Sequence, residues 1–180
     1  MDLSPYVLET DRLILRPFRM SDLDDFYEYC SVEGVGENAG WKRHSSREES
    51  RMVLEDFLKN RCDFALTDRA SGKVIGSFGV MDRPLRGYER YRQCELGYVL
   101  AKPYWGKGLM TEACKSVIRF CFEQLNLEML WISHFDFNTR SRRVIEKCGF
   151  RYIGQYPGVD SEGKETVLFR YVLFNPRYFY

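Results

Sequence analysis

Two glycines separated by one residue stand where a strand-like segment meets a helix-like segment, in KPYWGKGLMTEA (102–113). Residues 94–100, CELGYVL, are apolar and β-prone, and apolar side chains after the glycines recur with a period near 3.6. The first N–H groups of a helix lack intrahelical partners and carry partial positive charge. Glycine lets the main chain approach a ligand closely, so Gly106 and Gly108 suit an anion, above all a phosphate.

The glycine spacing by itself leaves several kinds of turn open. The P-loop pattern GxxxxGK[ST] occurs nowhere in the chain. The dinucleotide fingerprint GxGxxG fails at its third glycine, where Thr111 stands, and no parallel strand–helix–strand unit with a well-placed acid follows. A lone GxG is a weak signal, so a tight turn without any ligand remains an alternative at this point.

The bulk composition excludes several classes of protein. The chain has 180 residues, enough for one domain with a substantial core. Its 27 Lys and Arg against 26 Asp and Glu leave a formal net charge of +1, which indicates no particular partner and disfavours nucleic acid. No apolar run approaches the roughly 20 residues that span a bilayer, and the N-terminal stretch lacks the layout of a signal peptide. We therefore expect a cytoplasmic protein that does not enter membranes.

The cysteines and histidines do not predict a metal site. The 6 cysteines are scattered without CxxC spacing, and His44 and His134 are the 2 histidines. Cys114 and Cys121 fall on one face of the expected helix, which indicates small buried side chains in a reduced protein. We expect no metal.

The element pattern predicts an α/β fold in which residues 1–180 form a single domain. Its order is β-α-α-β-β-β-α-β-α-β-β, with a mixed, mostly antiparallel sheet flanked by helices. The first strand is expected within 9–19, and Ser21 is the expected N-cap of the first helix. Ser45 or Ser46 offers a capping box for the second helix, and Asn138 caps a late helix that ends before Gly149.

Three motifs together closely resemble the GNAT (Gcn5-related N-acetyltransferase) superfamily. They are ELGY (95–98), PYWGKGLMTEA (103–113) and N..S.RVIEKCGF (138–150). Within the superfamily they resemble the ribosomal-protein-alanine N-acetyltransferase branch, and the resemblance runs from about residue 10 to 174. It implies a GNAT-like domain whose sheet is splayed at the cofactor site, and acetyl-CoA as the co-substrate.

The resemblance also implies which residues bind the cofactor. The turn would hold the pyrophosphate of acetyl-CoA with its amides, the preceding strand would bind the pantetheine arm, and the late helix cap would help to hold that arm. The predicted cofactor-binding residues are Tyr98, Val99, Leu100, Trp105, Gly106, Lys107, Gly108, Leu109, Met110 and Asn138. Pro103 departs from the superfamily's Arg or Gln. It cannot donate to a ladder, so we expect it to end the strand and promote the splay.

Acetyl transfer to an amine needs a neutral nucleophile, a polarised thioester and a protonated leaving thiolate. Glu95 is the candidate base, and Ser141 is the candidate that contacts or protonates the sulfur. A plain strand-end carboxylate and a helix hydroxyl bonded to backbone are the alternatives for these two. Tyr98, Tyr104 and Tyr152 are alternative acids, and His134 could line the site, although packing explains these four more simply.

The predicted activity is acetyl-CoA-dependent N-acetyl transfer to a primary amine, which is a protein N-terminus or a small molecule. The first alternative is an acyl-CoA-binding module without turnover, and the second is an RNA-associated protein that uses the basic, aromatic loop 83–92. Loops 33–44 and 83–92 are the expected rim of the acceptor site. The acceptor itself stays open, and the protein is expected to be a monomer or a homodimer.

Overall fold

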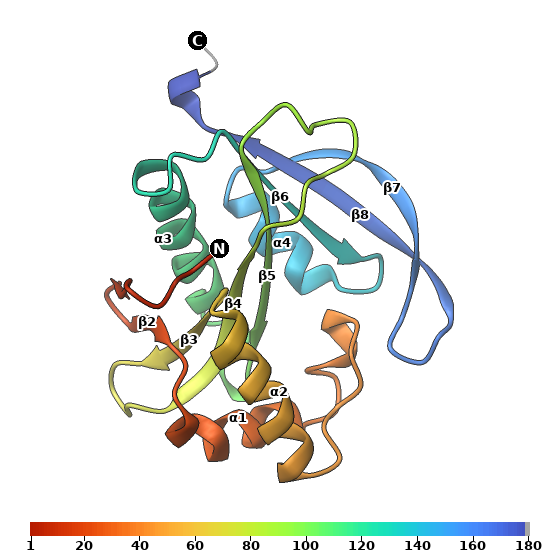
Figure 1. Ribbon diagram of the computed structural model, residues 1–180. Coiled ribbons are helices and arrows are strands. Elements are labelled where there is room, and N and C mark those ends of the chain that lie inside the picture. The colour runs from red at the N-terminus through yellow and green to blue at the C-terminus, as the bar shows by residue number, and fades with distance from the viewer. Residues whose placement is uncertain (179–180) are drawn as a thin grey trace.

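A computed structural model describes residues 1–178 as helices arranged around an eight-stranded sheet (Figure 1). The strand order is β1-β2-β3-β4-β5-β6-β8-β7. All described neighbours are antiparallel except the parallel pair β5 and β6, which confirms the mixed, mostly antiparallel sheet. The strands are β1 (Leu8–Glu9), β2 (Leu13–Pro17), β3 (Asp63–Asp68), β4 (Val74–Met81), β5 (Gln93–Leu100), β6 (Met129–Phe135), β7 (Arg151–Val159) and β8 (Glu165–Phe174).

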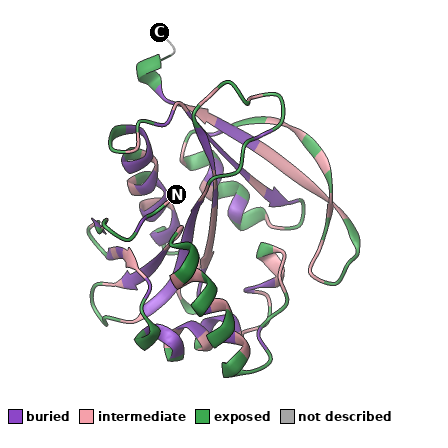
Figure 2. Cartoon of the chain, in the orientation of Figure 1, coloured by how far each residue is buried: buried purple, intermediate pink, exposed green. Residues whose placement is uncertain are grey.

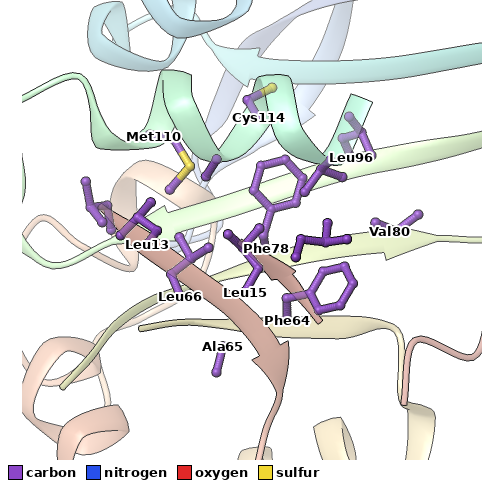
Figure 3. Close-up of a cluster of buried hydrophobic side chains, with 14 of the residues drawn as sticks. Leu13, Leu15, Phe64, Ala65, Leu66, Phe78, Val80, Leu96, Met110 and Cys114 are labelled. Carbon is purple, nitrogen blue, oxygen red and sulfur yellow. The ribbon is translucent and has the colours of Figure 1, made fainter. Parts of the chain in front are cut away.

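Helices cover both faces of this sheet. They are α1 (Leu23–Cys30), α2 (Arg47–Asn60), α3 (Leu109–Glu123) and α4 (Thr139–Lys147). α3 lies on one side of strands β2 to β5, and α1 and α2 lie on the other (Figures 1 and 3). Within residues 1–178, none of the helices has the length and apolar character needed to cross a bilayer.

The main core forms between α3 and the sheet. Met110 and Cys114 of α3 face Leu13, Leu66 and Phe78 on three strands (Figure 3), and α3 is buried along this side (Figure 2). Burying one such side chain stabilises the fold by about 1.5–3 kcal/mol. Cys114 and Cys121 are both 0% exposed, so the prediction of small buried side chains on one helix face is confirmed.

Two predicted helix starts are confirmed at atomic detail. The Ser46 hydroxyl accepts a hydrogen bond from the Glu49 amide (3.1 Å) at the start of α2. The Asn138 side-chain oxygen accepts one from the Ser141 amide (3.1 Å) at the start of α4. Past the end of α4, Gly149 has φ +85°, a left-handed conformation that favours glycine.

At the N-terminus one strand was missed and one predicted cap is wrong. β2 confirms the strand predicted within 9–19, but the short strand β1 precedes it, and residues 10–13 form a turn that is closed by a hydrogen bond from the Thr10 amide to the Leu13 carbonyl (3.0 Å). Ser21 does not cap α1 but lies in a 3-10 turn, Met20–Asp22. The carboxylate of Asp22 closes this turn by accepting a hydrogen bond from the Arg19 amide (2.8 Å). Asp22 is the N-cap residue of α1, and its side chain makes no capping bond to the helix.

The parallel strands β5 and β6 separate at their carboxyl ends, and we call this opening the fork. Their pairing stops at Leu96 and Ile132. Beyond this row β5 stays paired with β4 up to Leu100, and β6 stays paired with β8 up to Phe135 (Figure 1). The predicted splay is thus confirmed. Its predicted cause is wrong, because the strands part well before Pro103, which lies in the 3-10 turn Lys102–Tyr104.

Candidate active site

A cavity of about 320 Å³ opens at the fork, between the end of β5, the start of α3 and the exposed face of α4. Every predicted site residue lines it except Glu95 and Lys107. Loop 33–44, which the sequence predicted as part of the acceptor rim, contributes residues to this cavity, and so do residues of α3 and α4 that were not predicted as site residues. These additional lining residues include Val35, Asn38, Ala39, Thr111 and Val144.

The glycine turn presents free backbone amides to this cavity. Gly106 and Gly108 have φ +75° and +78°, a region that L side chains rarely adopt. Gly108 is the N-cap of α3 and offers no side chain to the helix amides. Within residues 1–178, the amides of 106–110 have no hydrogen-bond acceptor. Unpaired, partly positive N–H groups at the start of a 15-residue helix form an anion site.

A carboxylate behind the turn holds it in place. The Arg12 Nη1 donates to the Lys107 carbonyl (2.9 Å), and Glu112 of α3 forms an ion pair with Arg12 (2.6 Å). The Thr10 hydroxyl also donates to Glu112 (2.6 Å). Glu112 therefore anchors the β1–β2 turn to α3. The Lys107 side chain lies over the Tyr104 ring (5.2 Å) and not in the cavity.

Cations from α4 stand at the same cavity. Arg140, Arg143 and Lys147 contribute to its lining. The Arg140 guanidinium lies over the Trp105 ring at 4.5 Å, and the Trp105 indole donates to the Leu100 carbonyl (2.7 Å). A basic rim next to unpaired amides favours a ligand that carries several phosphates.

The backbone of β5 offers further groups at the fork. The Ala101 amide donates to the Ile75 carbonyl on the β4 side (2.7 Å). Because bonded and non-bonded pairs alternate along an antiparallel ladder, the peptide groups of Tyr98 and Leu100 face the other side, where β6 has turned away. Trp105 occupies the Leu100 carbonyl. Tyr98 is left with an N–H and a C=O that can bind an extended ligand as a strand would.

Asn138 joins the cavity to the loop that follows α1. Its side-chain oxygen caps α4, and its Nδ2 donates to the Asn38 carbonyl (2.9 Å). Asn38 belongs to the 3-10 turn Glu37–Ala39, which forms part of the cavity wall. The Asn138 amide therefore positions two walls of the cavity.

Ser141 and Tyr98 form a hydrogen-bonded pair beneath the cavity. Their hydroxyl oxygens are 2.9 Å apart, and Ser141 is buried at the start of α4. Burial raises the pKa of Tyr98, so its phenol stays protonated and can donate to the Ser141 hydroxyl oxygen or to the Ser141 carbonyl oxygen (3.3 Å). When the phenol donates to the hydroxyl oxygen, the serine proton is free to point into the cavity. Sequence reasoning named both residues but not the pair, because they come from elements far apart in the chain.

Glu95 lies on the opposite face of β5, since successive side chains of a strand alternate. It pairs in register with Trp131, one row before the fork. Its side chain is 15% exposed and accepts a hydrogen bond from Arg83 Nη1 (3.1 Å). Burial raises the pKa of Glu95 above the ordinary carboxyl value, although the Arg83 contact opposes this. A carboxylate of raised basicity suits a general base.

The remaining candidates have structural positions. His134 is buried, with Nδ1 2.7 Å from the Phe135 carbonyl oxygen and Nε2 3.2 Å from the Tyr171 hydroxyl, so both ring nitrogens have partners. Tyr152 is 54% exposed on β7 and does not line the cavity. Tyr104 lines the cavity edge in the turn before the glycines.

Known proteins identify the family to which this arrangement belongs. The model of the acetyltransferase (GNAT) domain matches residues 12–151. The chain belongs to the GNAT acetyltransferase family. It is 28% identical to the [ribosomal protein uS5]-alanine N-acetyltransferase of Escherichia coli (strain K12), with 89% of this chain and 88% of that protein covered. It is 26% identical to the uncharacterized N-acetyltransferase YoaA of Bacillus subtilis (strain 168), with 82% and 84% covered.

Solved structures share the GNAT fold over nearly the whole chain. The acetyltransferase (GNAT family) from Bacillus anthracis superposes with a TM-score of 0.83 at 20% identity, covering 94% of this chain and 99% of that one. The ribosomal-protein-S5-alanine acetyltransferase from Vibrio fischeri gives 0.77 at 20% identity, with 95% and 97% covered. The resemblance predicted from the sequence motifs is therefore confirmed, and the chain is a GNAT-type N-acetyltransferase.

Proposed function

We propose that this enzyme transfers the acetyl group of acetyl-CoA to the primary amine of a protein N-terminus, with a small amine as the second candidate acceptor. The observation that carries the proposal is the continuity of one cavity from the free amides of the glycine turn to the fork. A phosphate site and an open strand edge are the two features that a nucleotide with a long amide-containing arm requires. Residues 1–180 are proposed to act as one acetyltransferase domain in the cytoplasm.

The cofactor-binding roles follow from the lining of the cavity. The amides of 106–110 would hold the pyrophosphate, with the cations of α4 at the rim. The Trp105 amide, which the sequence also assigned to this role, donates instead to the Lys102 carbonyl (3.2 Å). The backbone of Tyr98, Val99 and Leu100 would pair with the pantetheine arm, while Asn138 positions the wall opposite. Lys107 would contribute its backbone only, since its side chain lies over Tyr104.

The chemistry places two groups on opposite faces of β5. Glu95 would accept a proton from the attacking amine, directly or through water, on the face away from α3. Ser141, backed by the Tyr98 phenol, would donate to the sulfur as the carbon–sulfur bond breaks. An amide of β5 at the fork could stabilise the carbonyl oxygen as it gains charge. A thiol has an ordinary pKa near 8.5, so the hydroxyl pair needs to give only modest help.

Removing the Ser141 hydroxyl tests this assignment. We expect Ser141→Ala to reduce kcat by roughly ten- to a hundredfold, the size of one lost transition-state hydrogen bond of about 1.5–3 kcal/mol. CoA affinity should stay near the parent value, because Asn138 still caps α4 through the residue 141 amide. Steady-state kinetics and calorimetry measure the two effects. An unaltered kcat would leave the hydroxyl with a structural role, and lost CoA binding would make it a binding residue.

A panel of amines tests the proposed function as a whole. The enzyme is incubated with acetyl-CoA and with peptides and small amines, and acetylated products are detected by mass spectrometry. We expect acetylation that requires both enzyme and acetyl-CoA, with peptide N-termini preferred, as the name of the Escherichia coli relative suggests. CoA binding without any product would instead support the alternative of a binding module without turnover.

A further inference from the structure

Arg170 of β8 carries a guanidinium that has no hydrogen-bond partner among residues 1–178. Its Nε is buried and makes no hydrogen bond, and within residues 1–178 no carboxylate forms an ion pair with the guanidinium. The guanidinium instead lies over the Tyr156 ring at 4.0 Å and is 5.8 Å from the centre of the Trp131 ring. A donor this deeply buried is out of reach of a ligand. The two Nη groups of Arg170 are not among the buried donors and make no hydrogen bond within residues 1–178, so they remain open to an oxygen acceptor.

The sheet register places this guanidinium beside the fork. β6 and β8 pair Trp131 with Val172 and Ser133 with Arg170, while β5 pairs Glu95 with Trp131. Paired residues project to the same face, so Glu95, Trp131 and Arg170 share the face away from α3. Arg170 belongs to the row after that of Glu95, in the direction in which the strands part. The positive charge of Arg170 is close enough to lower the pKa of Glu95.

The side chains around Arg170 are held in place by hydrogen bonds in which Arg170 itself takes no part. The Trp131 indole donates to the Arg83 carbonyl (2.8 Å), and the Arg83 side chain bonds to Glu95. The Tyr156 ring of β7 also lies against the guanidinium. Stacking on aromatic faces fixes the plane of an arginine while its N–H groups remain able to bind an oxygen acceptor.

We propose that Arg170 binds a carbonyl or carboxylate oxygen of the acceptor, so that the acceptor is an α-amino acyl compound. Arginine has only donors and therefore selects an oxygen acceptor. Glu95, nearby on the same face, would accept the proton of the amine. The negative charge of Glu95 and the positive charge of Arg170 thus match the amine nitrogen and the carbonyl oxygen of one compound, which are separated by the α-carbon and the carbonyl carbon. A peptide N-terminus and a free amino acid share this chemistry, whereas an alkyl amine or a lysine side chain lacks the adjacent oxygen.

This inference rests on the proposed acetyl transfer and narrows its acceptor. The test compares kcat/KM for a short peptide with N-terminal alanine, the same peptide with its first carbonyl reduced to methylene, free alanine, and an N-blocked peptide with one lysine. We expect the parent enzyme to prefer the first peptide over its reduced analogue by roughly ten- to a hundredfold, the range for a hydrogen bond to a charged group. The peptide and free alanine distinguish the two sources of the oxygen.

Variants then assign the preference to one side chain. Arg170→Met should raise the KM of the intact peptide and abolish the preference over the reduced analogue, while Arg170→Lys keeps part of it. The exposed Arg177, changed to Met, is the matched control and should behave as the parent. Unchanged CoA affinity in Arg170→Met would separate acceptor recognition from a general loss of structure.

Three outcomes would count against the inference. Equal rates for the two peptides with the parent enzyme, or an undiminished preference in Arg170→Met, would overturn the role of Arg170 and leave acetyl transfer standing. If no amine is acetylated, the proposed function fails and the inference fails with it. Should Arg170→Met not fold, the peptide comparison on the parent enzyme decides alone.

Discussion

Gly108→Val is expected to weaken CoA binding by at least about a hundredfold, or about 2.7 kcal/mol. Gly108 has φ +78° and faces the cavity at the start of α3. A β-branched residue there is strained, and it also fills the space through which a phosphate must approach the amides. Titration calorimetry with CoA measures the loss.

The strain and the steric effect can be separated with a control. Gly72 lies in the turn between β3 and β4 with φ +75°, and no heavy atom lies within 4 Å of a Cβ added there. Gly72→Val therefore imposes a similar backbone penalty away from the cavity and should leave the CoA affinity unchanged. If Gly108→Val binds CoA as the parent does while remaining folded, the glycine turn is not the pyrophosphate site.

Glu95→Gln is expected to lower kcat by roughly a hundred- to a thousandfold near neutral pH, within the range for loss of a general base. The amide keeps the size of the side chain and can still meet Arg83 but cannot accept the proton. CoA affinity should change little, because Glu95 does not line the cavity. Steady-state kinetics over a pH series measures the effect.

The loss of Glu95 should also change how the activity depends on pH. A base works only when deprotonated, so the activity of the parent falls as the pH drops through the pKa of Glu95. Because burial raises this pKa, the fall begins at a higher pH than an exposed carboxylate would give. Glu95→Gln should lack this acidic limb. Parent-like turnover by the variant across the pH range would remove Glu95 from the mechanism.

Much of the fold was predictable because local sequence determines it. The period of residues 109–123, the serine and asparagine caps of α2 and α4, and the glycine after α4 each depend on neighbours within one or two turns. The errors have the same origin. Ser21 is a residue type that often caps helices, but the carboxylate of Asp22 closes the turn before α1. Arg16 holds this carboxylate in place through an ion pair (2.8 Å). The short strand β1 depends on bonds that Thr10 and Arg12 make to the distant Glu112.

The candidate site was predictable only where motifs are contiguous. The glycine turn and the Asn138 cap were named from local residues, whereas the Ser141–Tyr98 pair depends on how α4 docks against β5. Arg170 could not be found from the chain, because its importance comes from an unpaired donor between Trp131 and Tyr156, which belong to two other strands. From the alternation of polar and apolar side chains along β8 alone, Arg170 would be taken for an ordinary polar residue.

A crystal structure of the protein with bound CoA tests the central claim most directly. We predict that the pyrophosphate lies on the amides of 106–110, that the pantetheine arm pairs with the backbone of Tyr98 at the fork, and that the thiol ends near Ser141. The Glu95 carboxylate should then face, from the other side of β5, the position at which an acetyl carbon on that thiol would lie. Density for CoA on another surface, or a pantetheine arm that leaves the fork empty, would contradict the account.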